Sequence, residues 1–120
     1  MIALNEEIKK FIKNHAEEMC PRECCGFIVS DRKNFLKFIP AKNISDNNIE
    51  FCIDPNEFLE INNEYKIEYI YHSHADQKYE NFSEEDIICA KNLNKNLILY
   101  ITGTNIYKIY LYDTEEVVYG

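Results

Sequence analysis

Two histidines near the middle of the chain are separated by a single residue, in the stretch YIYHSHADQKYENFSEED that spans residues 69–86. They are His72 and His74, and the whole chain of 120 residues contains only three histidines. Side chains at positions i and i+2 of a strand point to the same face of a sheet, so both imidazoles can meet one ion. Neutral imidazole is among the commonest metal ligands in proteins. The pair therefore predicts a metal site at the end of a strand.

Asp86 is the candidate for a third ligand. A catalytic zinc ion commonly has three protein ligands and leaves its fourth position to water. A carboxylate in the first turn of the next helix can be brought back over the strand end by the intervening loop. The competing interpretation is structural, because Ser83 followed three residues later by Asp86 is also an ordinary helix N-terminus, and an H-x-H pair can occur by chance. Their order between positions 72 and 86 favours a zinc site with one ion per chain.

A zinc site that hydrolyses a bond also needs a base beside the metal. The base should be a carboxylate that is held near the ion without ligating it. Glu23 is the candidate, because it lies in the stretch CPRECCGFIV immediately before a predicted strand, where the sheet can fix its position. Gly26 allows close backbone approach in the same stretch. The alternative for Glu23 is an exposed glutamate in a loop.

The remaining reactive residues give weaker signals. His15 is expected at the border of the apolar face of the first helix. Cys24 and Cys25 lack a separate histidine and asparagine that would activate a nucleophile, so they are expected to pack at the start of a strand. All five cysteines are expected to be thiols. Tyr79 and Phe82 lie in the loop before Ser83 and are candidates for contact with a substrate.

The elements that must position these side chains follow from hydrophobic periodicity and capping signals. Helices are expected over residues 5–19, 54–65 and 83–94, the second with Asp54 as N-cap and Pro55 in its first turn. Strands are expected over 24–30, 35–40, 49–53, 67–74, 97–103, 106–113 and 115–119, and residues 41–48 are expected to form a loop. This order predicts the α/β class, with a mixed sheet packed by about three helices.

Composition and charge limit the possible partners. A length of 120 residues fits one domain, expected over residues 1–120. The formal net charge of −8 disfavours nucleic acid, because binding to phosphate backbones needs a surplus of Lys and Arg. No apolar run is long enough to span a membrane, and the first residues lack the pattern of a secretory signal. We therefore expect a soluble cytoplasmic protein without a nucleic-acid or membrane partner; the sequence does not indicate its oligomeric state.

The whole set of residues resembles the JAMM motif of the MPN (JAB) metallopeptidases. The matching positions are a glutamate before the first strand, H-S-H, and S-x-x-D at the start of a helix, and the stretches PRECCG, FCIDPNEF and YHSH are most similar to the small prokaryotic and phage-encoded branch. The resemblance covers roughly residues 6–112. It implies the JAMM/MPN fold, with layers similar to those of cytidine deaminases. One departure is that eight residues separate His74 from Ser83 where the usual pattern has seven, which predicts a bulge in this loop.

The resemblance also implies an activity and assigns roles. It implies that His72, His74 and Asp86 bind zinc, that Glu23 is the general acid/base, and that Ser83 helps to stabilise the oxyanion of a tetrahedral intermediate. The implied reaction is hydrolysis of a peptide or isopeptide bond at the C-terminal tail of a ubiquitin-like or sulfur-carrier-like protein. Two alternatives stay open: a peptidase of phage tail assembly, and a non-catalytic MPN scaffold that binds a partner protein.

Overall fold

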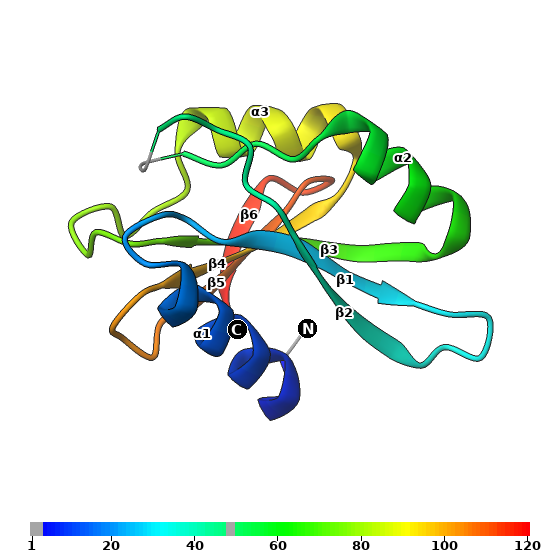
Figure 1. Cartoon of the computed structure of the whole chain (residues 1–120), viewed down its shortest axis with the longest axis horizontal. Coiled ribbons are helices and arrows are strands. Elements are labelled where there is room, and N and C mark those ends of the chain that lie inside the picture. The colour runs from blue at the N-terminus through cyan, green and yellow to red at the C-terminus, as the bar shows by residue number, and fades with distance from the viewer. Residues whose placement is uncertain (1–3, 48–49) are drawn as a thin grey trace.

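The computed structural model describes residues 4–47 and 50–120, and these form one mixed sheet with helices on both faces (Figure 1). The helices are α1 (Glu6–Met19), α2 (Pro55–Glu64) and α3 (Glu84–Leu93). The strands are β1 (Cys25–Ser30), β2 (Leu36–Ala41), β3 (Lys66–His74), β4 (Asn96–Ile101), β5 (Tyr107–Leu111) and β6 (Glu116–Tyr119). The expected α/β class, with a mixed sheet and three helices, is confirmed.

The six strands lie in the order β2-β1-β3-β4-β5-β6. The β3–β4 pair is parallel and every other pair is antiparallel. A parallel pair needs a crossover connection, and α3 with its preceding loop provides it between β3 and β4. Strand β3 therefore lies inside the sheet, between β1 and β4, and it ends at His74, where the chain leaves the sheet for the crossover.

Each helix begins after a residue whose side chain caps its first turn, and two of these caps, Asp54 and Ser83, were predicted from the sequence. The side chain of Asn5 accepts a hydrogen bond from the Ile8 N–H at the start of α1. Asp54 accepts one from the Asn56 N–H, with Pro55 in the first turn of α2. Ser83 caps α3, which ends at Asn94 in the left-handed conformation (φ 53°). The described helices thus agree with the expected ranges to within a residue or two, because short-range hydrogen bonds set their ends.

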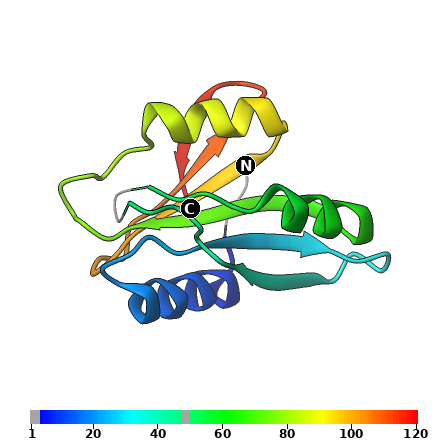
Figure 2. The same ribbon diagram turned by 45° about the horizontal axis from the view of Figure 1, so that its top comes forward.

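The two faces of the sheet are covered by different helices (Figures 1 and 2). Helix α1 packs on one face, where Ile8, Ile12 and Ala16 join a buried cluster with Tyr71. Helices α2 and α3 pack on the other face, over a second buried cluster that includes Ile70. Alternation along β3 explains the division, since neighbouring residues of a strand face opposite sides. The same alternation places His72 and His74 on the side of Ile70.

The expected strand over residues 49–53 is wrong for the residues that the structure describes. Residues 50–53 are irregular, and residue 49 lies outside the described part of the chain. This segment pairs with the loop before it through a single backbone bond, from Ile44 N–H to the Cys52 carbonyl (2.9 Å). The side chain of Asn43 takes the place of a partner strand, accepting a hydrogen bond from the Cys52 N–H at 3.0 Å. Alternating apolar residues could not reveal that a side chain would replace a strand.

No helix among the described residues is long and apolar enough to cross a membrane.

All five cysteines are free, with Cys24 and Cys25 buried at the start of β1. Their backbone aligns β1 with β3, since Cys25 is paired with His72 across the sheet. The start of β1 and the end of β3 therefore lie side by side, which brings Glu23 to the histidines.

Candidate metal centre

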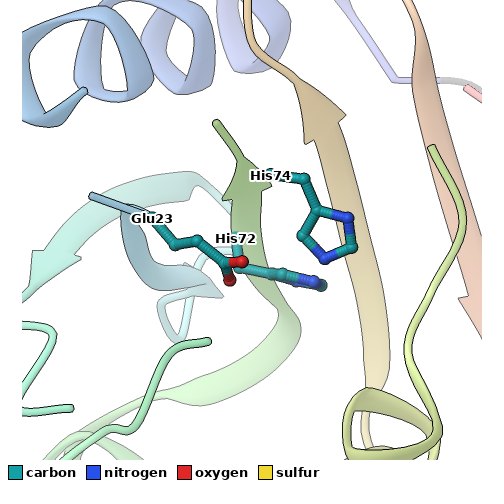
Figure 3. A group of neighbouring side chains, drawn as sticks. All are labelled: Glu23, His72 and His74. Atoms are coloured by element: carbon teal, nitrogen blue, oxygen red, sulfur yellow. The ribbon is translucent and has the colours of Figure 1, made fainter. Parts of the chain in front are cut away.

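The two histidines of β3 are buried at the end of the strand. His72 is 0% exposed and His74 is 5% exposed, and their ring centroids lie 5.1 Å apart. Buried imidazoles need partners for their ring nitrogens, or a ligand. Figure 3 shows the carboxylate of Glu23, which enters from the segment before β1, beside the two rings. The potential ligand atoms of Glu23, His72 and His74 all lie within 4.8 Å of one another.

Asp86 approaches the same two rings from the first turn of α3. Its Oδ2 atom lies 3.1 Å from Nε2 of His72 and 3.3 Å from Nε2 of His74. The same oxygen accepts a hydrogen bond from the Ser83 N–H (2.9 Å), and the Asp86 N–H donates to the Ser83 hydroxyl (3.1 Å). The two interpretations of S-x-x-D are therefore compatible, because one carboxylate oxygen both completes a capping box and faces both histidines.

The ring of His74 is oriented by the loop that follows it. Its Nδ1 atom lies 2.6 Å from the Tyr79 carbonyl oxygen. A carbonyl only accepts hydrogen bonds, so Nδ1 must carry the hydrogen. In the neutral imidazole, Nε2 then holds a lone pair that points toward Asp86. A lone pair and a carboxylate oxygen at 3.3 Å repel each other unless a proton or a cation lies between them.

His72 is held by ring contacts. Phe51 stacks on it with ring centroids 4.5 Å apart and an interplanar angle of 25°, and Phe82 lies at 5.8 Å. Its Nδ1 atom is buried and has no hydrogen-bond partner among the described residues. Stacking therefore fixes this ring together with the contact between Nε2 and Oδ2 of Asp86.

The eight-residue loop after His74 still delivers Asp86 to the strand end. A turn closes at its centre, where the Tyr79 N–H bonds the Asp76 carbonyl (3.0 Å). Lys108 of β5 then ties the loop down, with its ammonium 2.6 Å from the Glu80 carbonyl and 2.9 Å from Oδ1 of Asn81. The additional residue is accommodated in this tethered loop and does not displace the first turn of α3.

Burial and neighbouring charges shift the pKa values in the metal-free centre. Burial raises the pKa of Glu23 to about 8; His74 opposes this, whereas Asp86 and Glu50 add to it. Burial alone would lower the pKa of His74, but the hydrogen bond with Asp86 and the charge of Glu23 raise it. Burial alone would raise the pKa of Asp86, but His72 and the other hydrogen-bond donors hold it well below the usual range. Asp86 is therefore held ionised beside the two histidines.

Two cavities meet beside the histidines. The first, of about 490 Å³, is lined by His74, Ser83 and Asp86 together with Tyr79 and Phe82. The two aromatic residues that the sequence proposed for substrate contact therefore border this cavity.

The second cavity, of about 440 Å³, shares Phe51 and Cys89 with the first, and it is lined mainly by apolar residues such as Phe58, Leu59 and Ile70. Ile70 precedes His72 by two residues on the same face of β3, so this cavity begins about 7 Å along the strand from His72.

The sequence interpretation missed three residues that contact this centre: Asn43, Phe51 and Ser73. Asn43 is 6% exposed and Ser73 is 0% exposed. Asn43 stands in a segment expected to be a polar loop, and Ser73 is the middle residue of H-S-H. Their partners are distant along the chain, so no local pattern could identify them. His15, by contrast, lies on the other face of the sheet, with Nδ1 2.8 Å from the Tyr71 hydroxyl.

The family follows from a comparison with known domains. Residues 6–115 match the model of the family described as prokaryotic homologs of the JAB domain. The chain belongs to this family. The match spans most of the prokaryotic JAB chain, from the start of α1 to the turn before β6. The resemblance that the sequence motifs indicated is thereby confirmed.

Solved structures support the same fold for the prokaryotic JAB chain. It is similar to the solution structure of protein DSY2949 from Desulfitobacterium hafniense, with 21% identity, a TM-score of 0.67, and coverage of 100% of this chain and 90% of that one. It is also similar to the crystal structure of AF2198, a JAB1/MPN domain protein from Archaeoglobus fulgidus, with 18% identity, a TM-score of 0.61, and coverage of 92% and 88%. No curated protein sequence gives a match.

Proposed function

We propose that this prokaryotic JAB domain is a zinc-dependent peptidase or isopeptidase in which His72, His74 and Asp86 bind one zinc ion per chain. One observation carries the proposal: Oδ2 of Asp86 lies 3.1 and 3.3 Å from the Nε2 atoms of the two histidines. Ligands about 2.0–2.1 Å from a tetrahedral zinc ion are separated by about 3.3 Å. The Asp86 oxygen lies at nearly this separation from each of the two histidine nitrogens, which supports a shared ion.

The chemistry of the donors supports a cation. The Tyr79 carbonyl keeps the hydrogen of His74 on Nδ1, which leaves Nε2 free to ligate. Asp86 is held ionised in a buried position, where a charge without compensation is costly. Glu23 offers a further carboxylate within 4.8 Å of the ring nitrogens. We assign Asp86 as the ligand because it lies at ligand–ligand distance from both rings, and Glu23 as the group beside the ion.

Glu23 would then move the protons of the reaction. A zinc ion bound here would supply Lewis acidity and lower the pKa of a water in the cleft to about 7. The Oε1 atom of Glu23 is buried and has no hydrogen-bond partner among the described residues. It is therefore available to accept a proton from the water and to pass it to the leaving amine. A nearby cation would also lower the raised pKa of Glu23, which would favour the form that accepts a proton.

Ser83 would contribute through its hydroxyl group. Its oxygen accepts a hydrogen bond from the Asp86 N–H, and Ser83 borders the larger cavity. The hydroxyl hydrogen has no acceptor among the described residues, so it can donate to an oxyanion that forms in this cavity. Such a donor typically stabilises the transition state by a few kcal/mol.

The two joined cavities support a polypeptide as the substrate class. A chain whose scissile carbonyl lies by the histidines can place a neighbouring side chain in the apolar cavity, because side chains on one side of an extended chain repeat about every 7 Å. We propose the C-terminal tail of a ubiquitin-like or sulfur-carrier-like protein, in a peptide or isopeptide bond. The acidic residues Glu50, Glu80 and Glu85 around the larger cavity suit a tail with basic side chains.

Zinc content is the first measurement. Elemental mass spectrometry of the untagged protein should give about one zinc per chain, and His74→Ala should lose it. His15→Ala is the matched control, because His15 lies on the other face of the sheet and should retain zinc. A protein that takes up no zinc after incubation with the metal would contradict the proposal and favour the scaffold role.

Hydrolysis is tested on two substrates: a reporter fused to the tail of a ubiquitin-like protein, and a mixture of proteome-derived peptides. Mass spectrometry should find new termini with the zinc protein and none above background with Glu23→Gln, which should keep its zinc. Loss of zinc in Glu23→Gln would instead make Glu23 a ligand.

A further inference from the structure

The peptide group that joins Glu23 to Cys24 is held from both sides by side chains. Its carbonyl oxygen, on Glu23, accepts a hydrogen bond from Nδ2 of Asn43 at 3.0 Å. Its N–H, on Cys24, donates to the hydroxyl oxygen of Ser73 at 2.9 Å. Both bonds are buried, where loss of a partner leaves an unsatisfied polar group. The backbone next to Glu23 is therefore fixed by two residues that lie far from it along the chain.

Ser73 connects this peptide group to the histidines. It is the residue between His72 and His74, and its own N–H donates to the Cys24 carbonyl at 3.1 Å. Ser73 thus bonds Cys24 twice, once through its backbone and once through its side chain. These two bonds continue the pairing of β1 with β3 beyond the Cys25–His72 pair. The position of the Glu23 backbone relative to the two histidines therefore depends on these two bonds.

Asn43 connects the same peptide group to the ring that stacks on His72. Besides its bond to Glu23, its Nδ2 donates to the Glu50 carbonyl at 3.1 Å. Its Oδ1 accepts from the N–H groups of Ser45 and Cys52, each at 3.0 Å. The amide therefore uses all four of its hydrogen-bonding positions. Because Phe51 lies between Glu50 and Cys52, Asn43 fixes Glu23 and the segment that covers His72 together.

We infer that Asn43 and Ser73 are positioning residues for Glu23, and that they act by clamping the peptide group after it. This inference rests on the proposed function. The Oε1 atom of Glu23 has no partner among the described residues, so that oxygen makes no bond that would fix the carboxylate. The backbone must then set where the carboxylate lies, and a displacement of about 1 Å can cost about 100-fold in rate.

Ser73→Ala tests one side of the clamp. It removes the acceptor of the Cys24 N–H and leaves every proposed zinc ligand in place. On the best-cleaved peptide of the proteome-derived mixture, kcat should fall about 10- to 100-fold, with KM within about twofold and zinc content unchanged. Ser73→Thr, which keeps a hydroxyl, should recover most of the loss. A kcat like that of the unmodified protein, or a loss of zinc in Ser73→Ala, would overturn the inference.

Asn43→Asp tests the other side. The aspartate keeps the shape and the two acceptor bonds to Ser45 and Cys52, but it loses the donors to the Glu23 and Glu50 carbonyls. We expect the same pattern, a lower kcat with little change in KM. In a Glu23→Gln background neither Ser73→Ala nor Asn43→Asp should lower the residual rate further, because both act through Glu23. Additive losses would assign them a role apart from Glu23.

Ser30→Ala is the matched control for a lost buried hydroxyl. Ser30 ends the same strand, β1, is 5% exposed, and donates to Oε2 of Glu68 at 2.6 Å. It should lower the thermal midpoint about as much as Ser73→Ala does, while kcat stays unchanged. An equal fall of kcat in both variants would mean that Ser73 affects kcat only through the general stability of the fold.

One readout needs no substrate. Amide hydrogen exchange of Cys24 in the zinc-loaded protein should be slow, and it should accelerate in Ser73→Ala and stay slow in Ser30→Ala. A protein that hydrolyses nothing but shows this acceleration would refute the proposed function and retain the clamp. Exchange at Cys24 that is unaffected by Ser73→Ala would overturn the clamp whatever the activity.

Discussion

The two faces of the sheet differ in how the polar atoms of two adjacent buried residues are hydrogen-bonded. Tyr71 and His72 are adjacent in β3 and both are 0% exposed. On the α1 face, the Tyr71 hydroxyl is paired with Nδ1 of His15 at 2.8 Å. On the α2 and α3 face, Nδ1 of His72 and Oε1 of Glu23 have no partner among the described residues, and the third such buried atom is Oγ1 of Thr102. The Tyr71–His15 pair is thus satisfied within the protein, whereas the centre around Glu23 has bonding capacity left for a ligand.

This difference indicates which part of the fold contributes mainly to stability and which part is available for function. A buried polar group without a partner costs about 1–3 kcal/mol, so the unpaired Oε1 of Glu23 is expensive unless a ligand uses it. On the α1 face, the polar pair of Tyr71 and His15 is packed among apolar side chains. Substitutions on that face should therefore act on stability, and substitutions at the metal centre should act on binding and rate.

The largest expected effect contrasts Glu23→Gln with Tyr71→Phe. Glu23→Gln should lower kcat about 10²- to 10⁴-fold, the usual contribution of a general acid/base, and retain zinc. Tyr71→Phe removes the partner of His15 and should cost about 1 kcal/mol of unfolding free energy, with kcat unchanged. Steady-state kinetics and denaturant unfolding measure the pair. A large fall of kcat in Tyr71→Phe would break the separation between the two faces.

The stability of the zinc-free protein should fall as the pH rises from about 5.5 to 8. The folded-state pKa of Glu23 is raised from 4.5 to about 8, and that of His74 is also raised, so both groups bind protons more tightly in the folded state. That contribution is complete below the unfolded-state pKa values and is lost as the pH rises through the folded ones. The loss should be roughly 1–3 kcal/mol by denaturant unfolding with a chelator present.

Zinc should reverse this pH trend. Ligands must lose their protons to bind a metal, so the stabilisation that zinc adds should grow between pH 5.5 and 8. Parallel unfolding curves with zinc and with chelator measure the difference. A zinc-free protein that becomes more stable toward pH 8 would contradict the assigned burial of Glu23.

Gly26→Ala should damage the α1 face and spare the metal centre. A Cβ atom at Gly26 would lie 2.5 Å from Cε2 and Cζ of the Tyr71 ring, which is closer than real contacts allow. Overpacking of this kind costs about 1–3 kcal/mol. Unfolding measurements should show that loss while zinc content stays at one per chain. Zinc lost together with stability would mean that the two faces are coupled through β1.

The smallest expected effect concerns the apolar cavity. Leu59 lines this cavity and is 55% exposed, so Leu59→Lys should disturb folding little and raise KM about tenfold for a tail with a large apolar side chain. Ile88→Lys is the matched control, since Ile88 of α3 is 51% exposed and is not among the residues that line either cavity. Equal KM values for the two variants would remove the apolar cavity from substrate binding.

Local patterns in the sequence predicted most of the elements. Asp54 and Ser83 each cap the helix that their position indicated, because a cap involves residues only two or three apart. Residues 50–53 were mispredicted because apolar alternation cannot tell a strand from an extended segment held by a side chain. Secondary structure can therefore be predicted from the sequence wherever the hydrogen bond that decides it joins residues close together along the chain.

The candidate site could likewise be predicted only where its residues lie close together along the chain or next to a recognisable element. His72, His74 and Asp86 lie within one strand–loop–helix unit, and the structure brings them together. Glu23 was found because it precedes a strand. Asn43 and Ser73 escaped because their bonds to the Glu23–Cys24 peptide group join residues 20 and 49 positions apart. The register of β1 against β3 reveals Ser73, and the path of the loop after β2 reveals Asn43.

The single oxygen of Asp86 that faces both histidines also accepts the N–H of Ser83. Removal of an ion from this oxygen would alter the charge that holds the first turn of α3. The order of this turn and the binding of an ion would therefore depend on each other. Fraying of that turn would carry Asp86 and the Ser83 hydroxyl away from the histidines in the same movement.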